Sequence, residues 1–484
     1  MTISGALSNA LSGLRAASRG VEVVSSNISN ALTPGYARRE LSLASSGIGD
    51  FGGVRIGGIQ RIMDAGLASD KRLADAALQN TSAATGFLTR LENLIGTPDN
   101  PASLSARLSG FESSLITAAS RPDAPERLAS AVQDAQGLVN SLNRASAGIQ
   151  EARTFADRTI SGQVDQLNTA LTEVRDLNIR VTAAAVQGND FSALLDQRQL
   201  VVDQISALVP VKQVPRDTGQ IALYSTGGAI LLDGTAATIG FQKTNVVTPY
   251  LSIDNNTLSG LTLNGIAVRT DSERGGLRGG ALGAQFEIRD EFGVQAQAQL
   301  DAVARDLVER FQDPAVDPTL GIGDAGLFTD GPGFFDPLDE TGLSSRLRIN
   351  QTVDPDQGGE PWRIRDGNHA PAPGNVGYAS LLQNLGAALS ATRIPASGGF
   401  GGGGFSSTSL VSAFASEISA NRTNAEQKQS YASARLSELT DRQLADGVDT
   451  DAEIQRLILI EQSYAANARM VQTVDELLDI LTRI

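Results

Sequence analysis

The two ends of the chain share one spacing of apolar positions, and the middle does not follow it. Apolar or small side chains recur at alternating steps of four and three from Ile3 to Ala31, and again from Leu457 to Leu481. A repeat averaging 3.5 residues places such side chains on one face of a helix, as in coiled coils. The pattern predicts two long terminal helices that pair with each other and with further copies. The predicted assembly seam consists of Ile3, Leu7, Leu14, Val21, Val24, Ile28, Leu457, Ile460, Tyr464, Val471, Val474, Leu478 and Leu481.

Breaks in the periodicity divide the N-terminal half. The first helix is predicted over about Thr2 to Leu32, because the Thr-Pro-Gly-Tyr segment at 33–36 removes a backbone donor and favours a turn. Residues 37–62 contain two glycine pairs and are predicted to be extended or irregular. Helical spacing returns near Asp64, and Pro and Gly breaks separate the predicted helices of a bundle that continues to Leu208.

The pattern then becomes β-like and later returns to helix. Asn264-Gly265, flanked by alternating apolar residues, predicts a tight hairpin within a β-rich insert. Six glycines in the segment Ser397–Gly404 predict a flexible linker. The last helix is predicted to open at Thr450 with Glu453 three residues on, which is the spacing of a capping box.

These features predict a mainly α fold with a β-rich insert. The terminal helices pair as a coiled coil, a helical bundle follows, and a small β domain lies at the far end. The predicted segments are the N-terminal axial helix at 1–36, which pairs with 450–484; the first half of the bundle at 37–208, with its extended segment at 37–62; the β-rich insert at 209–280; a long bundle helix at 281–312; a β and loop continuation at 313–375; further bundle helices at 376–446, with the linker at 397–404; and the C-terminal axial helix at 450–484.

An ordinary amphipathic helix on a globular core is the alternative explanation of each terminal pattern. Two features favour assembly instead. The N-terminal spacing persists for about four heptads, and the opposite face is mostly Ser, Asn, Gly and Ala, with only Arg15, Arg19 and Glu22 charged. The apolar surface that one pair of helices buries also gives less free energy than the conformational entropy that ordering both helices costs. We therefore expect both termini to be mobile in the isolated monomer and to become ordered on assembly.

Composition narrows the function. The net charge of −15 disfavours nucleic-acid binding and attachment to an anionic membrane surface, and the absence of cysteine removes disulfides, thiolate metal sites and thiol nucleophiles. No apolar run has the length of a membrane span. The first residues lack the apolar core of a cleaved leader, so an exported chain is expected to use a route that reads no such leader.

Candidate catalytic or metal-binding residues are few. His369 is the single histidine and lies in a predicted loop, where a surface position is expected. Asp446, Asp449, Asp451 and Glu453 lack EF-hand spacing, and helix capping accounts for them without a metal. Paired carboxylates for glycoside hydrolysis stay open, although aromatic residues make up only 5% of the chain. No catalytic site, cofactor or metal is predicted, and we expect the protein not to be an enzyme.

Two local motifs resemble one known family. The stretch Ser26–Tyr36 is similar to the Asn-Ile-Ala-Asn…Thr-Pro-Gly-Tyr signature of flagellar axial proteins, with Ser29 at the usual alanine. The run Glu461–Arg469 is similar to the Gln-x-x-Tyr-x-Ala-Asn-Ala-Arg motif of the same class. The long helical block at 64–208 then resembles the hook-associated protein 1 family within that class. The motif residues are Asn27, Asn30, Thr33, Pro34, Gly35, Tyr36, Gln462, Asn467 and Arg469.

The resemblance implies a structural subunit of the bacterial flagellum that forms the junction ring between hook and filament. It implies export through the flagellar type III apparatus to the extracellular distal hook. The implied partners are identical subunits, the hook protein on one side, the next junction protein on the filament side, and a cytosolic export chaperone at the C-terminal helix.

Two other functions stay open at this stage. The chain could be another axial flagellar component, such as a hook protein or flagellin. An exported enzyme on a helical scaffold is the alternative outside the structural class. Removal of the last 35 residues separates them, because a junction subunit would lose assembly whereas an enzyme with an independent site would keep turnover.

Overall fold

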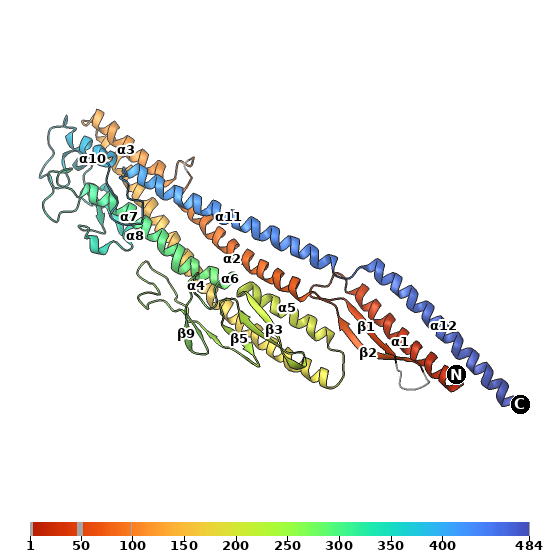
Figure 1. The fold of residues 1–484 in the computed structure, drawn as a ribbon. Helices are drawn as coiled ribbons and strands as arrows, with labels where there is room; N and C mark the ends of the chain where they lie inside the picture. The colour runs from red at the N-terminus through yellow and green to blue at the C-terminus, as the bar shows by residue number, and fades with distance from the viewer. Residues whose placement is uncertain (1–2, 46–51, 98, 484) are drawn as a thin grey trace.

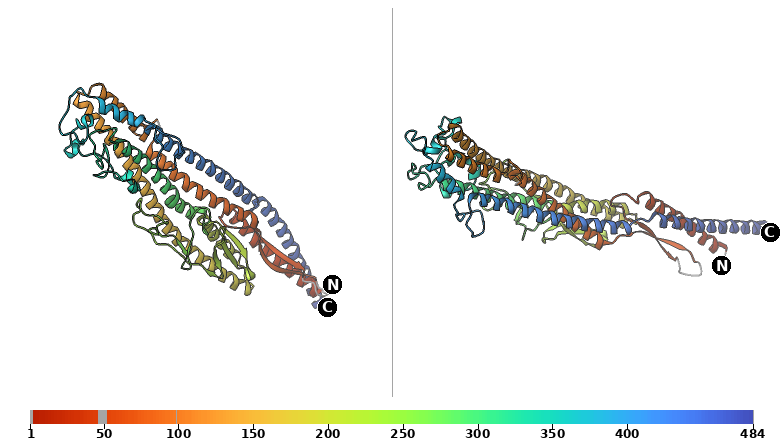
Figure 2. Two further views of the ribbon diagram at one scale, coloured as in Figure 1. Left: turned by 60° about the vertical axis from the view of Figure 1, so that its left-hand side comes forward. Right: turned by 90° about the horizontal axis from the view of Figure 1, so that it is seen from above.

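The computed structural model is a long rod in which both ends of the chain lie at the same narrow tip (Figure 1). It describes residues 3–45, 52–97 and 99–483. The long helices follow the rod axis, and further views show the first and last helices side by side at the tip (Figure 2). The chain folds back on itself, so that residues 426 positions apart, Asn27 and Glu453, come into contact.

The narrow tip, here called the terminal unit, contains two helices and one hairpin. These elements are α1 (Ile3–Ser29), β1 (Arg39–Ser45), β2 (Val54–Arg61) and α12 (Thr450–Arg483). The helices run antiparallel and pack along each other, while the antiparallel strands lie against α1 (Figure 1). The predicted pairing of the terminal helices is confirmed.

Most of the remaining helices form the bundle, which is the body of the rod. Its members are α2 (Ala65–Ile95), α3 (Leu104–Ser120), α4 (Pro125–Val186), α5 (Ser192–Leu208), α6 (Gly280–Phe286), α7 (Gly293–Phe311), α10 (Ser380–Ser390) and α11 (Ser407–Ala445). Polar side chains begin several of them: Asp64 accepts from two backbone amides of α2, and Ser103 accepts from one of α3. The 62-residue α4 connects the two halves of the body.

Two hydrophobic cores lie on either side of the middle of α4. The distal core packs α3, α7, α10 and α11 around the N-terminal half of α4, and it centres on three phenylalanines. The ring of Phe111 lies 6.1 Å from that of Phe311 and 5.7 Å from that of Phe328, centre to centre. The second core packs the C-terminal half of α4 against α5, α6 and the β insert. Both cores belong to the bundle.

The β insert consists of short antiparallel strands. They are β3 (Val211–Pro215), β4 (Ile221–Ser225), β5 (Ile230–Asp233), β6 (Thr235–Ala236), β7 (Ile239–Gly240), β8 (Leu261–Leu263) and β9 (Ile266–Val268). The predicted hairpin is present, with Asn264 and Gly265 both at positive φ between β8 and β9. These strands flank the middle of the rod, and the pair β10 (Phe328–Asp330) and β11 (Leu347–Ile349) lies near the tip opposite the chain ends (Figure 1).

The predicted long helix at 281–312 contains one irregular turn. A π-helical segment, Glu287–Phe292, separates α6 from α7. Within it, Arg289 is fully buried, and its guanidinium donates to Asp157 of α4 at 2.6 Å and to the backbone oxygen of Ser259 at 2.9 Å. The turn therefore holds a loop of the β insert against α4.

The region after α7 forms the distal end. It contains the short helices α8 (Leu343–Arg346) and α9 (Arg363–Asp366) among loops. The glycine-rich segment after α10 is closed at its base, because the backbones of Arg393 and Phe405 exchange two hydrogen bonds. It therefore forms a closed loop beside the bundle.

Among the residues that the structure describes, no helix combines the length and the apolarity that crossing a membrane requires.

Candidate functional site: the paired terminal helices

α1 and α12 meet through a row of residues that repeats every seventh position on both helices. Asn27 contacts Glu453, Gly20 faces Ile460, and Gly13 faces Asn467. Each step of seven toward the N-terminus on α1 matches a step of seven toward the C-terminus on α12. The next α12 position in the row, Val474, is buried. The terminal helices therefore form an antiparallel coiled coil with one fixed register.

Two glycines allow this close approach. A Cβ atom on Gly13 would lie 2.7 Å from Nδ2 and 2.8 Å from Cγ of Asn467. A Cβ atom on Gly20 would lie 3.1 Å from Cδ1 of Ile460. Small residues thus form the inner face of α1, which includes Gly5, Ala10, Ala16, Ala17, Gly20, Val23, Val24 and Asn27 among its buried positions.

Asn27 is the polar centre of the unit, and its side chain is fully buried. Its Nδ2 donates to Glu453 at 3.0 Å and to the backbone oxygen of Arg39 at 2.9 Å. Its Oδ1 accepts from the Tyr36 hydroxyl at 2.8 Å and from the backbone amide of Arg39 at 2.9 Å. All of its hydrogen-bonding capacity is used, which joins α1, the following turn, β1 and α12 at one point.

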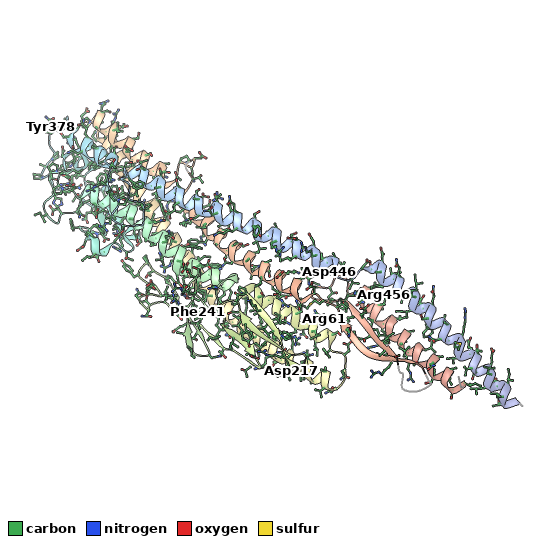
Figure 3. The ribbon with its side chains drawn as sticks, in the orientation of Figure 1. Arg61, Asp217, Phe241, Tyr378, Asp446 and Arg456 are labelled. Atoms are coloured by element: carbon green, nitrogen blue, oxygen red, sulfur yellow. The ribbon has the colours of Figure 1, made fainter. Side chains whose placement is uncertain are left out.

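The turn after α1 connects the terminal unit to the bundle. Gly35 has φ of +78°, and a Cβ there would lie 2.5 Å from Cγ of Leu200 on α5, so both conformation and space favour glycine. Asp196 of α5 accepts from Arg39 at 2.8 Å and from Arg61 at 2.7 Å, and Figure 3 shows Arg61 at this junction. Burial raises the pKa of the Tyr36 hydroxyl, which keeps it protonated as a donor to Asn27.

The predicted capping box at the start of α12 is wrong. The carboxylate of Asp449 accepts from the backbone amides of Asp451 at 2.9 Å and Ala452 at 3.1 Å, so Asp449 caps the helix. Glu453 is buried and points to Asn27 and Arg456. The Glu453 carboxylate therefore makes a long-range hydrogen bond with Asn27 in place of the capping contact that the local motif predicted.

The predicted seam residues fall into three groups in the single chain. Val24 and Val474 are buried. The half-buried members are Ile3, Leu7, Leu14, Val21, Ile28, Leu457, Ile460 and Val471. Tyr464, Leu478 and Leu481 are exposed. The positions of α1 that face α12 thus lie one residue away in sequence from the larger apolar residues of the predicted seam. Contact between these larger residues and other copies stays a prediction.

The motif residues divide in a similar way. Asn30 donates through Nδ2 to the backbone oxygen of Ser26 at 2.9 Å. It directly follows α1, which ends at Ser29 and not at the predicted Leu32. Thr33 donates to Asn30, and Asn467 packs on Gly13. Pro34, Gln462 and Arg469 are exposed. Sequence reasoning did not identify Gly13, Gly20, Glu453 and Asp196 as members of this site, although the period of seven at 13, 20 and 27 was a readable signal.

The described residues of the terminal unit offer packing surfaces. Across the described ranges, no three His, Cys, Asp or Glu side chains lie close enough to hold a metal ion. His369 lies far from the terminal unit along the chain; it is exposed, and its Nδ1 lies 3.3 Å from Asp324. The chemistry of this site is therefore the burial of apolar helix faces.

Comparisons with known proteins point to flagellar axial proteins. The model "Flagellar hook-associated protein FlgK helical domain" matches residues 88–314, within the bundle and its β insert. Two models of flagellar rod proteins match the ends: "Flagella basal body rod protein" at 7–36 and "Flagellar basal body rod FlgEFG protein C-terminal" at 445–484. A relative named flagellar hook-associated protein 1, from Bacillus subtilis, is 23% identical over 98% of this chain and 96% of its own length. The chain is similar to the flagellar hook-associated protein 1 family at both ends and through its body.

Other members of the family match over shorter stretches. The hook-associated protein 1 of Escherichia coli is 26% identical over 67% of this chain, which covers 59% of that relative. The protein of Salmonella typhimurium is 29% identical over 49% of this chain, which covers 44% of that relative. The chain thus spans about half the length of these two relatives. A solved structure, the flagellar hook junction protein FlgK from Burkholderia pseudomallei, is 22% identical with a TM-score of 0.43, over 55% of this chain and 47% of that one.

Proposed function

We propose that this protein is a structural subunit of the bacterial flagellum that forms the junction between hook and filament. The observation that carries the proposal is the antiparallel coiled coil of α1 and α12, with the Asn27 centre at its base. This unit lies at the positions where rod-protein models match, and the bundle lies where the hook-associated helical model matches. The chain thus combines an axial terminal unit with a body of the junction type.

The assembly step is the burial of apolar surface that one chain leaves exposed. Tyr464, Leu478 and Leu481 are exposed members of the seam, and Leu7, Leu14 and Val21 are half-buried. Neighbouring subunits would cover these side chains and order the terminal helices, in the same way as helices in larger coiled coils. A subunit of this kind acts by packing and needs no cofactor or catalytic group.

The proposed partners follow from this position. Identical subunits form a ring, the hook protein lies on one side, and the next junction protein lies on the filament side. A cytosolic chaperone would cover the exposed apolar residues of α12 before export through the flagellar type III apparatus. The proposed location is the extracellular flagellum at the distal end of the hook.

A second axial role, as hook protein or flagellin, has less support. The long helical block α2 to α5 directly follows the terminal unit, and the helical model of hook-associated proteins covers most of that block. The matches to rod-protein models are confined to the terminal segments. The body of the chain therefore favours the junction role.

A gene-deletion experiment tests the proposed function. Cells that lack the gene should build hooks without filaments and should not swim, and the full chain supplied in trans should restore both. A chain truncated after residue 449 should fold its bundle but restore neither property. The proposal would be rejected if the deletion strain kept normal filaments, whatever the behaviour of the truncated chain.

A further inference from the structure

α12 is longer than the described part of its partner, and its inner face continues past the first described residue of α1. The register set by Asn27 with Glu453 and by Gly13 with Asn467 places Leu477 opposite Ile3, the first described residue of α1. The row of seventh positions on α12 continues from Val474 to Leu481. Leu477, Leu478 and Leu481 are 45%, 40% and 57% exposed. The last turns of α12 therefore carry an inner face whose large apolar side chains the described residues of the same chain leave about half exposed.

A matching groove lies farther up the same unit, between α1, the hairpin and the first half of α12. It has a volume of about 500 Å³. Its apolar lining includes Val24 on α1, Leu41, Leu43 and Val54 on the hairpin, and Leu459 on α12. Leu43 and Leu459 are 52% and 62% exposed, so the groove opens to solvent through large apolar side chains.

The charged side chains at the border of the groove are already in ion pairs. Arg456, labelled in Figure 3, lies 3.1 Å from Glu40 and 3.3 Å from Glu453. Arg39 is bound to Asp196. An occupant therefore needs apolar side chains and no charge aimed at the floor, which describes the end of α12, where Leu477, Leu478 and Leu481 lie on one face.

We propose that the last turns of α12 in one subunit, residues 475–482, insert into this groove of a second copy. The proposal rests on the proposed function and specifies how neighbouring subunits connect. A second copy is the chosen occupant because the overhanging face continues an interface that the chain already makes with α1. The same face cannot reach its own groove, since Leu481 lies about 20 Å along the helix from Asn467 at the groove's end.

Insertion also fixes how neighbours are displaced along the axis. Leu481 of one copy would lie level with residues between Arg456 and Asn467 of the next, which requires an axial offset of about 20–40 Å at 1.5 Å per residue. Subunits would then connect as a staggered helical ring, each one holding the helix end of its neighbour.

Cysteine cross-linking tests the contact directly, because the natural chain contains no cysteine. The double variant L43C/L481C would be supplied to the deletion strain, and flagella would be isolated, oxidised and denatured. Insertion brings the two sulfur atoms of neighbouring subunits together and should give a ladder of covalent oligomers. Disulfide formation needs Cα atoms within about 7 Å, so subunits that pack differently should not be linked.

Matched controls separate the possible contacts. The variant Y431C/L481C carries its second cysteine on an exposed site of α11 and should remain monomeric. If L481C alone forms dimers as efficiently as the double variant, helix ends meet each other and the proposal is overturned. If L43C/L481C restores swimming but gives no ladder, or links mainly to another flagellar protein, the groove has a different occupant.

A second pair guards against a variant that assembles poorly. L459C/L478C places the cysteines on the opposite wall of the groove and one turn earlier on the overhang. At least one of the two pairs should both restore swimming and form the ladder. Absence of a ladder in a swimming strain overturns the inference but leaves the junction role intact, whereas normal filaments in the deletion strain overturn the junction role itself.

Discussion

The bundle and the terminal unit are both made of long helices, but they differ in how much of their apolar surface one chain covers. Buried residues recur along the whole length of α4, from Leu128 to Val181. In α12, Glu453 and Val474 are the buried positions among the described side chains, and leucines such as Leu459 and Leu481 are exposed. The bundle is complete within one subunit, whereas the terminal unit presents surface for others.

The two regions also use small and polar residues differently. In the bundle, large side chains fill the core, and buried charges such as Arg289 and Asp157 pair within it. In the terminal unit, Gly13 and Gly20 bring the helices together and Asn27 supplies a single polar centre. A small-residue interface buries less apolar area per residue, so its stability depends more on additional neighbours. Mutations should therefore separate folding of the body from order of the ends.

The largest expected effect is in the bundle core. Phe111→Ala removes a fully buried ring that contacts Phe311 and Phe328, and it should lower the free energy of unfolding by about 3–5 kcal/mol. Denaturant unfolding, followed by the fluorescence of the single Trp362, measures the change. Ile116→Ala on the same helix, where the side chain is 64% exposed, is the control and should change stability little. A loss below about 1 kcal/mol for Phe111→Ala would contradict the assigned core.

A smaller effect, confined to the other region, is expected for Asn27→Ala. The change removes the Asn27 donor from the buried Glu453 carboxylate, which keeps only Arg456, and it leaves the amide of Arg39 without an acceptor, which should cost about 2–3 kcal/mol. Hydrogen exchange of the isolated chain should show faster exchange in α1 and α12, with unchanged protection in α4. Ser25→Ala, an exposed neighbour on α1, serves as control. Equal loss of protection in α4 would mean that the two regions unfold together.

The sequence alone predicted those elements whose structure depends on a few neighbouring residues. The helices of the bundle and the Asn264-Gly265 hairpin follow from breaks and turn residues that act over a few positions. The coiled-coil spacing also identified the terminal helices correctly. The position of the β strands beside α4 and α5 could not be read locally, because it depends on contacts such as the one between the Asn178 side chain of α4 and the backbone oxygen of Ile221 in β4.

The site was harder to predict than the fold. Large apolar residues define a seam in sequence, but the single chain packs the smaller residues at 13, 20 and 27 against α12. Glu453 matched a local capping motif, and its carboxylate instead reaches Asn27, 426 residues away. A local sequence pattern shows the size and the spacing of the residues on a helix. It does not show which of two adjacent faces of that helix packs against another part of the same chain.

The smallest expected effect is on the pH dependence of stability, and it is expected in the bundle and not in the terminal unit. Burial raises the pKa of four carboxyl groups, Asp203, Glu287, Asp290 and Asp301, and all four belong to the bundle. A raised folded-state pKa means that the folded chain binds the proton more tightly than the unfolded chain. The stability that this tighter proton binding gives to the folded chain is complete below the ordinary pKa, which is 4.5 for glutamate. It is lost as pH rises through the raised pKa.

Glu287→Gln tests this dependence at one site. The neutral amide can still accept the hydrogen bond from Asn80, which is 3.3 Å long in the natural chain. The variant should be slightly more stable than the natural chain at pH 7, and its unfolding free energy should change less between pH 5 and pH 7. Glu173→Gln, on the exposed face of α4, is the matched control and should keep the natural dependence. Unfolding at the two pH values with Trp362 fluorescence measures the bundle, and hydrogen exchange of α1 should not respond to the Glu287 change. An unchanged pH dependence in Glu287→Gln would show that this carboxylate keeps enough contact with water to titrate normally.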